Sequence, residues 1–474
     1  MPLEADVTAK LTGLFREWKG IDPERLEPLP PTASNRTYVR LHTQQQRVIG
    51  CWNENIAENE SFIYLSNHFQ RKGLPVPQVY AVSADGRAYL QEDMGDITLF
   101  DHILVLRSFG EPEKSTWEKC YHPVIDDLIR FQTDGHQGLD YSRCYPSPRF
   151  GRREIHADLN YFRYYFLRLS GLSFHEDKLQ NGLDALAERI LNIPANYFMY
   201  RDFQSRNIMV RPAGYAYIDF QGGRQGPLQY DLASLLLNTR ADIPLEVRDA
   251  LYSYYIERLQ DKTEVRTEEF RQDYLAVALL RVLQTMGAYG FRGYFERKRL
   301  FLSGIPFGQR NLRWLLDQPG LSIENGLREI LEEVATSTHL TALAKDKLNV
   351  QIRSFSYKRG IPVDLSGHGG GFVFDCRILP NPGRYPEYQS LTGKDDMVRT
   401  YLSNQPEVDR FLSHVADIAI QAVDNYLQRG FQHLSLHFGC TGGRHRSVYC
   451  AEAIAARLKA VFDIDPDLRH LEIG

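Results

Sequence analysis

One stretch decides the fold of this chain. It reads Tyr200-Arg201-Asp202-Phe203-Gln204-Ser205-Arg206-Asn207-Ile208-Met209-Val210 and is followed by Tyr217-Ile218-Asp219-Phe220 and Tyr230-Asp231-Leu232-Ala233. Asp202 and Asn207 precede Asp219, which ends an apolar strand. Phosphoryl transfer from a metal nucleotide requires this set of groups in this order. One carboxylate takes the hydroxyl proton of the acceptor, and an amide oxygen and a second carboxylate hold Mg²⁺ on the phosphates. The stretch therefore predicts an ATP-dependent kinase.

The order of these side chains assigns their roles. We expect Asp202 to be the catalytic base, which orients the acceptor hydroxyl toward the γ-phosphate. Asn207 and Asp219 are the predicted metal ligands, since Mg²⁺ prefers hard oxygen atoms. Asp231 is expected to cap the helix Leu232–Leu237. The alternative, that these are solvated turn residues, suits any one of them alone better than the ordered set.

Length, composition and charge limit the class of protein. The 474 residues imply two to four domains, and the hydrophobic fraction of 43% is that of a globular protein. A formal charge of −4 provides no overall field for nucleic acid. The acidic N-terminus is unlike a signal peptide, and the apolar run Tyr274–Leu283 is interrupted by Arg281 and too short to span a membrane. Six cysteines without metal spacing indicate reduced thiols, so we expect a cytoplasmic protein.

The pattern of the chain predicts a bilobal α+β domain like that of protein kinases. Residues 1–95 should form a sheet lobe, with helices over Leu3–Lys19 and Asn55–Lys72 and strands over Thr37–His42, Arg47–Trp52, Gln78–Ser83 and Ala88–Glu92. Residues 96–335 are mainly helical, apart from two short strands around 207–219.

A separate α/β domain is expected over residues 348–474, after a linker at 336–347. The helical run ends with a predicted helix at Gly326–Val334. Beyond the linker, the pattern alternates between strands at Asn349–Ser356, Gly371–Arg377 and His433–Phe438 and helices at Val408–Gln428 and Ser447–Phe462.

The catalytic stretch resembles the aminoglycoside phosphotransferase/choline kinase superfamily, whose loop reads His-x-Asp with an Asn after four intervening residues. Within it, Arg201–Asn207 and Asp219–Pro227 resemble the N-acetylmuramate/N-acetylglucosamine anomeric kinases. Those enzymes phosphorylate C1 of an amino sugar with ATP, and the resemblance over residues 1–330 implies the same reaction. It also implies nucleotide contacts from Ser34, Asn35, Arg36 and Thr37 over the phosphates and from Glu92, Asp93 and Met94 at the adenine hinge. The candidates for substrate contacts are Arg224, Asp96 and His156.

Two positions depart from the superfamily pattern. Tyr200 replaces the loop His, so the loop must be braced differently. No Lys falls in the strands of the first lobe, so the usual Lys–phosphate contact is missing or is replaced by Arg36, Arg40 or Arg47. Glu60 is the candidate carboxylate for orienting that cation. A regulatory protein with an inactive kinase lobe is therefore an alternative to the active enzyme.

A second site is predicted where an apolar strand meets a helix late in the chain. The loop between them contains Cys440, Thr441, Gly442, Gly443, Arg444, His445, Arg446 and Ser447. Glycines let backbone N–H groups converge on an anion, the next helix adds its positive end, and arginine binds phosphate. The spacing of Cys440, Gly443 and Arg446 is also that of cysteine phosphatases, so attack by the Cys440 thiolate is a less favoured alternative.

The tail from Ser354 onward resembles the C-terminal domain of the RNase adapter RapZ. The resemblance is carried, in order, by Ser354–Pro362, Phe374–Pro382, Leu391–Gly393, Gln405–Val408 and Gly439–Ser447. It implies binding of a phosphosugar such as glucosamine-6-phosphate. The family's P-loop half and basic tail do not occur here, so RNA binding is not expected. Two modules linked to amino-sugar metabolism and cell wall recycling predict a sugar kinase, using ATP and Mg²⁺, with a phosphosugar-sensing domain.

Overall fold

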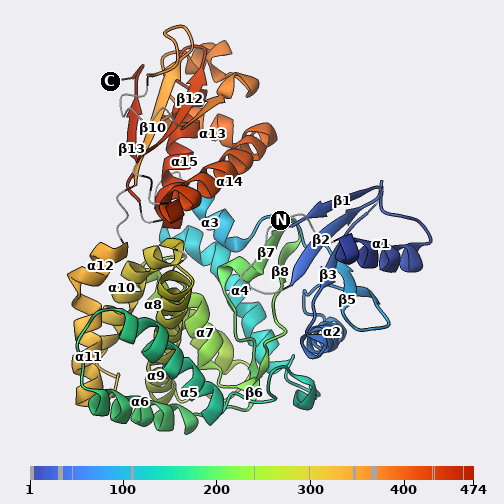
Figure 1. Cartoon of the computed structure of the whole chain (residues 1–474), viewed down its shortest axis with the longest axis vertical. Helices are drawn as coiled ribbons and strands as arrows, with labels where there is room; N and C mark the ends of the chain where they lie inside the picture. The colour runs from blue at the N-terminus through green and yellow to red at the C-terminus, as the bar shows by residue number, and fades with distance from the viewer. Residues whose placement is uncertain are drawn as a thin grey trace.

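The computed structural model describes residues 5–29, 36–44, 46–107, 111–239, 241–297, 299–344, 348–363, 371–429, 431, 433–462 and 464–473. It confirms the expected fold class. A bilobal kinase-like α+β domain, with an antiparallel sheet lobe and a helical lobe, precedes a separate α/β domain built on a parallel sheet (Figure 1).

The first lobe is a five-stranded antiparallel sheet packed between two helices. Its strand order is β1-β2-β3-β5-β4, with β1 (Arg25–Pro28), β2 (Thr37–His42), β3 (Arg47–Trp52), β4 (Val79–Val82) and β5 (Ala88–Glu92). Successive side chains of β5 point to opposite faces of the sheet, and each face packs on one of the two helices. Leu90 packs in one cluster with α1 (Ala5–Lys19), whereas Tyr89 stacks on Phe62 of α2 (Ile56–Arg71), with 5.0 Å between the ring centroids. The sequence pattern does not predict β1, because this polar segment becomes a strand only by pairing with β2.

The second lobe is helical and has α9 at its centre. Its helices are α3 (Leu99–Arg107), α4 (Lys114–Thr133), α5 (Arg152–Tyr161), α6 (Glu176–Leu191), α7 (Gln229–Leu236), α8 (Leu245–Gln260), α9 (Thr267–Gly290), α10 (Ile305–Leu316), α11 (Asn325–Thr336) and α12 (Thr338–Ala344). Within the described ranges, one helical stretch, Thr267–Phe295, is long and apolar enough to cross a membrane, but 78% of its apolar window is buried inside the protein. Such burial is what the core helix of a helical lobe shows. α12 occupies most of the segment expected as a linker.

Two short strand pairs carry the predicted catalytic stretch. β6 (Tyr197–Met199) pairs with β9 (Arg224–Gly226), and β7 (Ile208–Arg211) pairs with β8 (Gly214–Tyr217). Asp202 and Asn207 lie in the loop from β6 to β7, and Asp219 follows β8. The chain therefore brings the three residues to one edge of these strands.

The C-terminal domain contains a four-stranded parallel sheet in the order β11-β12-β10-β13. The strands are β10 (Asn349–Ser356), β11 (Gly371–Asp375), β12 (His433–Cys440) and β13 (Asp467–His470), and the helices are α13 (Asp396–Ser403), α14 (Pro406–Arg429) and α15 (Arg446–Phe462). The expected strands and helices are present, and β13 and α13 are additions that the sequence pattern does not predict.

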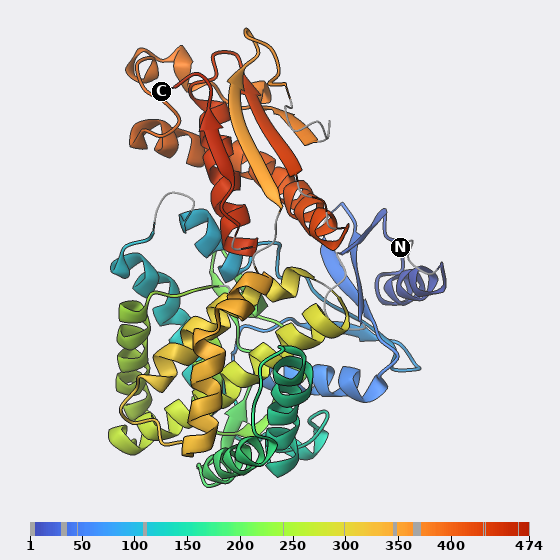
Figure 2. The same cartoon turned by 60° about the vertical axis from the view of Figure 1, so that its left-hand side comes forward.

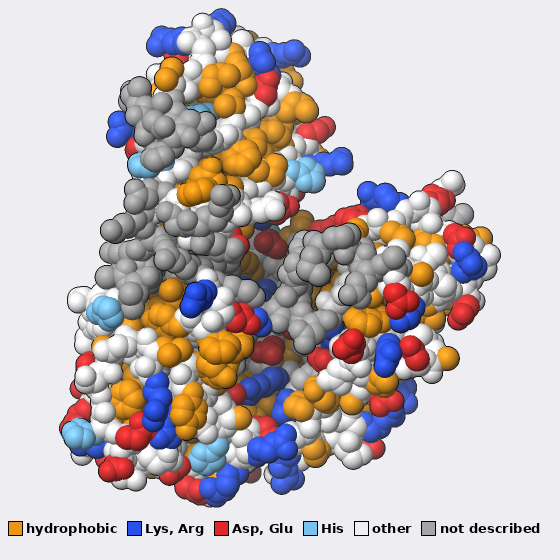
Figure 3. Space-filling view, in the orientation of Figure 1, with side chains coloured by type: hydrophobic (Ala, Val, Ile, Leu, Met, Phe, Trp, Pro, Cys, Tyr) orange, Lys and Arg blue, Asp and Glu red, His pale blue; other side chains and the backbone are white. Residues whose placement is uncertain are grey.

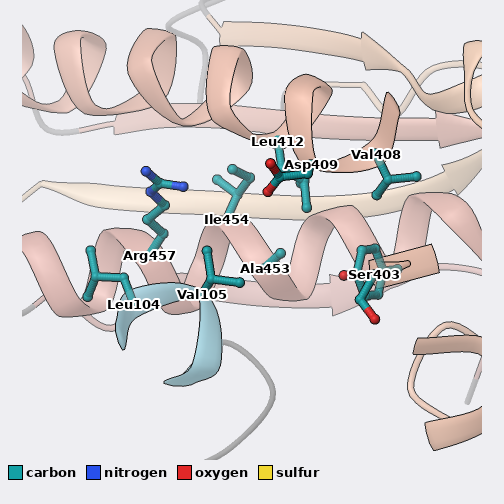
Figure 4. A pocket seen from close by; sticks show the side chains of 10 residues that line it. Leu104, Val105, Ser403, Val408, Asp409, Leu412, Ala453, Ile454 and Arg457 are labelled. Atoms are coloured by element: carbon teal, nitrogen blue, oxygen red, sulfur yellow. The ribbon is translucent and has the colours of Figure 1, made fainter. Parts of the chain in front are cut away.

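The C-terminal domain packs on the first helix of the helical lobe. Both cartoon views place one end of α15 beside α3 (Figures 1 and 2). Leu104 of α3 belongs to the same buried apolar cluster as residues of α14 and α15. It lines a small interdomain pocket of about 50 Å³ with Ile454 and Arg457 of α15 (Figure 4). The two domains therefore share a buried contact.

Candidate active site

Asp231 holds the backbone of the catalytic loop. Its carboxylate accepts hydrogen bonds from the backbone N–H groups of Tyr200 (2.6 Å) and Arg201 (2.9 Å). These bonds support the left-handed conformation of Arg201, whose φ is 83°. The expectation that Asp231 caps its own helix is wrong, because Asp231 lies inside the first turn of α7 and serves the preceding loop instead. Burial raises the pKa of Asp231 to about 7, against the lowering effect of the two N–H groups.

Arg201 fastens this loop to the helical lobe. Its guanidinium donates to both carboxylate oxygens of Asp158, at 2.8 and 2.6 Å. It also lies over the rings of Phe150 and Tyr230, 5.3 and 5.1 Å from their centroids. The bidentate ion pair and the two aromatic rings hold Arg201 in place. They therefore also fix the backbone from which the side chain of the next residue, Asp202, projects.

Tyr200 supplies the brace that the usual loop His would give. Its side chain is fully buried, and its hydroxyl donates to the backbone carbonyl of Ile218 (2.6 Å). Ile218 directly precedes Asp219, so Tyr200 ties the base-bearing loop to the strand end that carries the predicted metal ligand. The departure from the superfamily pattern is thus compensated within this chain.

Asn207 lies between the two predicted catalytic aspartates. Asn207 Nδ2 donates to the backbone carbonyl of Asp202 (2.9 Å) and lies 3.4 Å from Asp219 Oδ2. Gln221 Nε2 donates to the other oxygen of Asp219 (2.7 Å). Burial and the negative charge of Asp202 raise the pKa of Asp219. The carboxylates of Asp202 and Asp219 and the amide of Asn207 offer hard oxygen atoms, a donor set that fits Mg²⁺.

Arg36 is the most buried of the three candidates for the missing lysine. Its side chain is 1% exposed, and Nη2 lies 3.1 Å from Glu58 Oε1 on α2. The positive charge of Arg36 lowers the pKa of Asp219, which places this cation near the predicted metal ligand. Glu60, the carboxylate suggested by the sequence, is exposed, and Glu58 orients the cation instead. One helical turn offers both glutamates, and only the structure shows which of them faces the sheet.

The other two arginines that were candidates for the missing lysine brace the hinge. Arg40 donates to Asp93 Oδ2 (2.8 Å), and Arg47 Nε lies 3.2 Å from the same oxygen. The side chain of Asp93 is thereby committed to the sheet, and Asp96 accepts from Arg40 at 2.5 Å. Any adenine contact at this hinge must therefore come from the backbone or from Met94.

The remaining predicted nucleotide residues fall into three groups. Ser34 and Asn35 lie outside the described residues. Thr37 begins β2, and Glu92, at the end of β5, pairs with Arg211 at 3.2 Å. Met94 forms a small apolar cluster, apart from the main core, with Met209, Ala216 and Ile218. The cluster joins the hinge to β7 and β8, close to the catalytic loop, where an adenine ring needs an apolar surface.

A cavity of about 420 Å³ opens beside Asp202. Figure 3 shows that the molecular surface is hollowed between the sheet lobe and the helical lobe. The cavity wall includes polar side chains from the catalytic loop, from α7 and α9, and from the segments that follow these two helices, namely Asp202, Gln204, Arg206, Ser234, Asn238, Arg281, Gln284, Thr285 and Arg292. This volume accommodates a small polar acceptor at the carboxylate that we expect to act as base.

The sequence-predicted substrate contacts do not line this cavity. Arg224 is buried, and it donates to the backbone carbonyl of Gly222 (3.0 Å) and to Ser147 Oγ (3.1 Å). His156 lies beside Asp184, 3.9 Å away. Sequence reasoning missed Arg281 as a site residue, although a charge inside the apolar run of α9 was a visible signal.

The C-terminal loop is more constrained than its sequence suggests. Arg446 is buried and donates to the backbone carbonyls of Arg377 (3.1 Å) and Leu379 (3.0 Å), and His445 Nε2 lies 2.9 Å from the carbonyl of Tyr388. Thr441, Gly442 and Arg444 are exposed, whereas Gly443 and Ser447 are buried. The side chain of Cys440 is buried, with Sγ 3.1 Å from Ser447 Oγ.

Comparison with known proteins gives two family matches. The model of the phosphotransferase enzyme family matches residues 25–270, which is more than half of the chain, and that of the RapZ C-terminal domain matches residues 348–474. A nucleotide-binding protein of Thermotoga sp. (strain RQ2) is 34% identical over 215 residues, which are 44% of this chain and 69% of that protein. A nucleotide-binding protein of Xanthomonas euvesicatoria pv. vesicatoria is 38% identical over 145 residues, so the chain spans less than half of its length, 46%.

Among solved structures, choline kinase LicA from Streptococcus pneumoniae aligns over 66% of this chain and 100% of its own, with 14% identity and a TM-score of 0.46. The choline/ethanolamine kinase family protein from Mesorhizobium loti aligns over 70% of this chain and 99% of its own, with 13% identity and a TM-score of 0.45.

Proposed function

We propose that this chain, which belongs to the phosphotransferase enzyme family and carries a RapZ C-terminal domain, is a kinase that transfers the γ-phosphate of ATP to a sugar hydroxyl. The observation that carries this proposal is the arrangement of three residues: Asn207 donates to the backbone of Asp202 and lies beside Asp219, and Asp202 borders an open polar cavity. The buried Arg36–Glu58 pair supports an active enzyme over an inactive lobe, because it offers a fixed cation in a lobe whose strands carry no Lys and whose Arg40 and Arg47 are bound to Asp93.

The residues divide the reaction between them. Asp202 accepts the proton of the acceptor hydroxyl and keeps that oxygen in line with the γ-phosphate. Asn207 and Asp219 would hold Mg²⁺, which when bound would neutralise charge on the phosphates of ATP. Arg36, fixed by Glu58, binds the phosphates from the side of the sheet. Met94 and its apolar cluster support the adenine ring.

The proposed acceptor is the anomeric hydroxyl of N-acetylmuramate or N-acetylglucosamine. The support is the likeness of Arg201–Asn207 and Asp219–Pro227 to the corresponding segments of the anomeric amino-sugar kinases, together with a RapZ domain on the same chain. A cavity of about 420 Å³ with hydroxyl, amide and guanidinium groups suits a monosaccharide.

The test is ATP consumption with a panel of sugars that includes both N-acetylated sugars. Wild-type protein should consume ATP with at least one sugar, and Asp202→Asn should reduce kcat by about 10²- to 10⁴-fold, the usual contribution of a general base. Asp249→Asn, which changes an exposed carboxylate on α8, is the matched control and should leave kcat unchanged. Turnover that survives in Asp202→Asn would refute the role of the base.

A second function is proposed for the C-terminal domain, namely binding of a phosphorylated sugar that regulates the kinase. Its support is the RapZ family match and the exposed residues Thr441, Gly442 and Arg444, which precede the N-terminus of α15. Phosphatase chemistry at Cys440 is not proposed, because a buried thiol is badly placed to attack a phosphate ester from solvent.

Thermal shift with glucosamine-6-phosphate tests this binding. The ligand should raise the Tm of the full chain, and Arg444→Gln should reduce that increase. Lys459→Gln, which changes an exposed lysine near the C-terminal end of α15, is the control and should leave the increase in Tm unchanged. No shift in the wild type, or an equal shift with glucosamine, would contradict a phosphosugar site.

A further inference from the structure

The cavity beside Asp202 contains a buried arginine that the proposed mechanism leaves unused. Arg281 lies in the middle of α9, and its side chain is 6% exposed. Each of its guanidinium nitrogens has a partner: Nε donates to Ser234 Oγ (2.7 Å), Nη1 to Gln284 Oε1, and Nη2 to Asp202 Oδ1 (3.3 Å). Burying a guanidinium is costly unless it is paired, so a chain that places one inside its central helix gains something specific from it.

The contacts of Asp202 are unequal at its two oxygens. Oδ1 receives Arg281 Nη2 and also Gln204 Nε2, at 3.4 Å. In the part of the chain that the structure describes, no donor group hydrogen-bonds to Oδ2 of Asp202. The side chain of Asp202 is 46% exposed and borders the cavity. One oxygen is therefore held by the protein, and the other is left for an acceptor hydroxyl.

We propose that Arg281 is a positioning residue of the acceptor site. It holds Oδ1 of Asp202 so that Oδ2 faces the acceptor hydroxyl, and it keeps the carboxylate from turning toward the metal ligands. The inference rests on the proposed kinase function, since it assigns Arg281 a role through the base of that reaction. No bond of the substrate is made or broken at Arg281, and the acceptor proton goes to Asp202 Oδ2.

A purely structural role is the competing explanation. Arg281 also links α9 to α7 through Ser234, and its guanidinium lies 5.7 Å from the centroid of the Tyr230 ring. If these links were its only purpose, Arg281 would contribute to folding stability and to nothing else. The two roles differ in what they predict for the acceptor step, for nucleotide binding and for chemical rescue.

The kinetic experiment compares Arg281→Ala, Arg281→Lys and Arg248→Ala in the full chain, each at a temperature where melting curves show it folded. Arg248 is the matched control, because it is equally buried and pairs with the carbonyl of Ile243 and with Asn311, away from the cavity. Arg281→Ala should lower kcat about 10²-fold, with an unchanged Kd for the non-hydrolysable ATP analogue, whereas Arg248→Ala should lower stability alone.

Chemical rescue separates positioning from packing. Methylguanidine should restore at least about a tenth of the lost kcat to Arg281→Ala and nothing to Arg248→Ala, and Arg281→Lys should fall between Arg281→Ala and the wild type. Equal losses of kcat in the two alanine variants, no rescue, or a parallel loss of nucleotide affinity would overturn the proposal.

A crystal structure of Arg281→Ala gives a readout that does not depend on turnover. The carboxylate of Asp202 should rotate away from its wild-type orientation, and an unchanged carboxylate would refute the positioning role even if activity falls. If the wild type turns over no acceptor, the proposed function fails while this structural comparison still decides what Arg281 does to Asp202.

Discussion

Arg457 of the C-terminal domain and Asp101 of the kinase domain form an ion pair across the domain boundary, with Nη2 3.6 Å from Oδ1. The other oxygen of Asp101 accepts from the hydroxyl (2.7 Å) and the backbone N–H (3.2 Å) of Thr98. The backbone of Thr98 forms an antiparallel β-bridge with Met209 on β7, the strand that follows Asn207. The carboxylate of Asp101 thus connects α15, the helix that follows the RapZ-type loop, through Thr98 to β7, the strand that follows the catalytic loop.

This connection predicts that Arg457→Met uncouples the two domains. In the wild type, saturating glucosamine-6-phosphate should change the KM for ATP by about 5-fold or more, a usual size for a coupling between sites. In Arg457→Met the change should disappear, while kcat without effector stays within about 2-fold. Lys459→Met, which removes a cation that pairs within the C-terminal domain, is the control and should keep the response. A response preserved in Arg457→Met would show that the signal takes another route.

The buried cation of the first lobe makes a second prediction. Arg36→Met should lower kcat/KM for ATP about 10²-fold, because it removes a charged donor from the phosphates and leaves Glu58 without its cation. Arg36→Lys should retain part of the activity. Arg25→Met, which changes an exposed arginine of the first-lobe sheet, serves as the control and should leave kcat/KM for ATP unchanged. If Arg36→Met were as active as Arg25→Met, the replacement of the usual lysine by Arg36 would be wrong.

The buried carboxylate under the catalytic loop makes a prediction about pH. The folded pKa of Asp231 is about 7, above the ordinary value of 3.8, so between these pH values the folded state binds a proton that the unfolded state has lost. The contribution of Asp231 to stability is therefore complete below pH 3.8 and is lost as the pH rises toward 7, at up to about 1.4 kcal/mol per pH unit. Denaturant unfolding of Asp231→Asn should lack this component of the pH dependence. Parallel curves of unfolding free energy against pH for the two proteins would contradict it.

Much of the fold could be predicted from the sequence, since local patterns determine it. β2, β3, β5 and β10 begin and end where alternation and turn residues place them, and α2 follows its N-cap, Asn55. β1, β13 and β9 could not be predicted, because each is short and polar and becomes a strand only by pairing, β1 with the next strand and β13 and β9 with strands more distant in the chain. A register set by a partner far along the chain leaves no local signal.

The candidate site also contains residues that the sequence predicts and residues that only the structure reveals. The ordered motif predicts that Asp202, Asn207 and Asp219 act together, and in the structure the Asn207 side chain contacts the backbone of Asp202 and the carboxylate of Asp219. The groups that support them come from elsewhere in the chain. Glu58 rather than Glu60 faces Arg36, Asp231 holds the loop rather than its own helix, and Arg281 reaches Asp202 from α9. Helix phase and long-range packing decide such contacts, and a single sequence specifies neither of them directly.

Metal-dependent nucleotide binding tests the proposed kinase site most directly. Isothermal titration with a non-hydrolysable ATP analogue, with and without Mg²⁺, should show affinity that depends on Mg²⁺ in the wild type and in Asp202→Asn. Asp219→Asn should lose that dependence, because it removes the carboxylate that holds the metal. Equal, Mg²⁺-dependent affinity in Asp219→Asn and the wild type would contradict the assignment of Asp219 and with it the proposed arrangement of the catalytic centre.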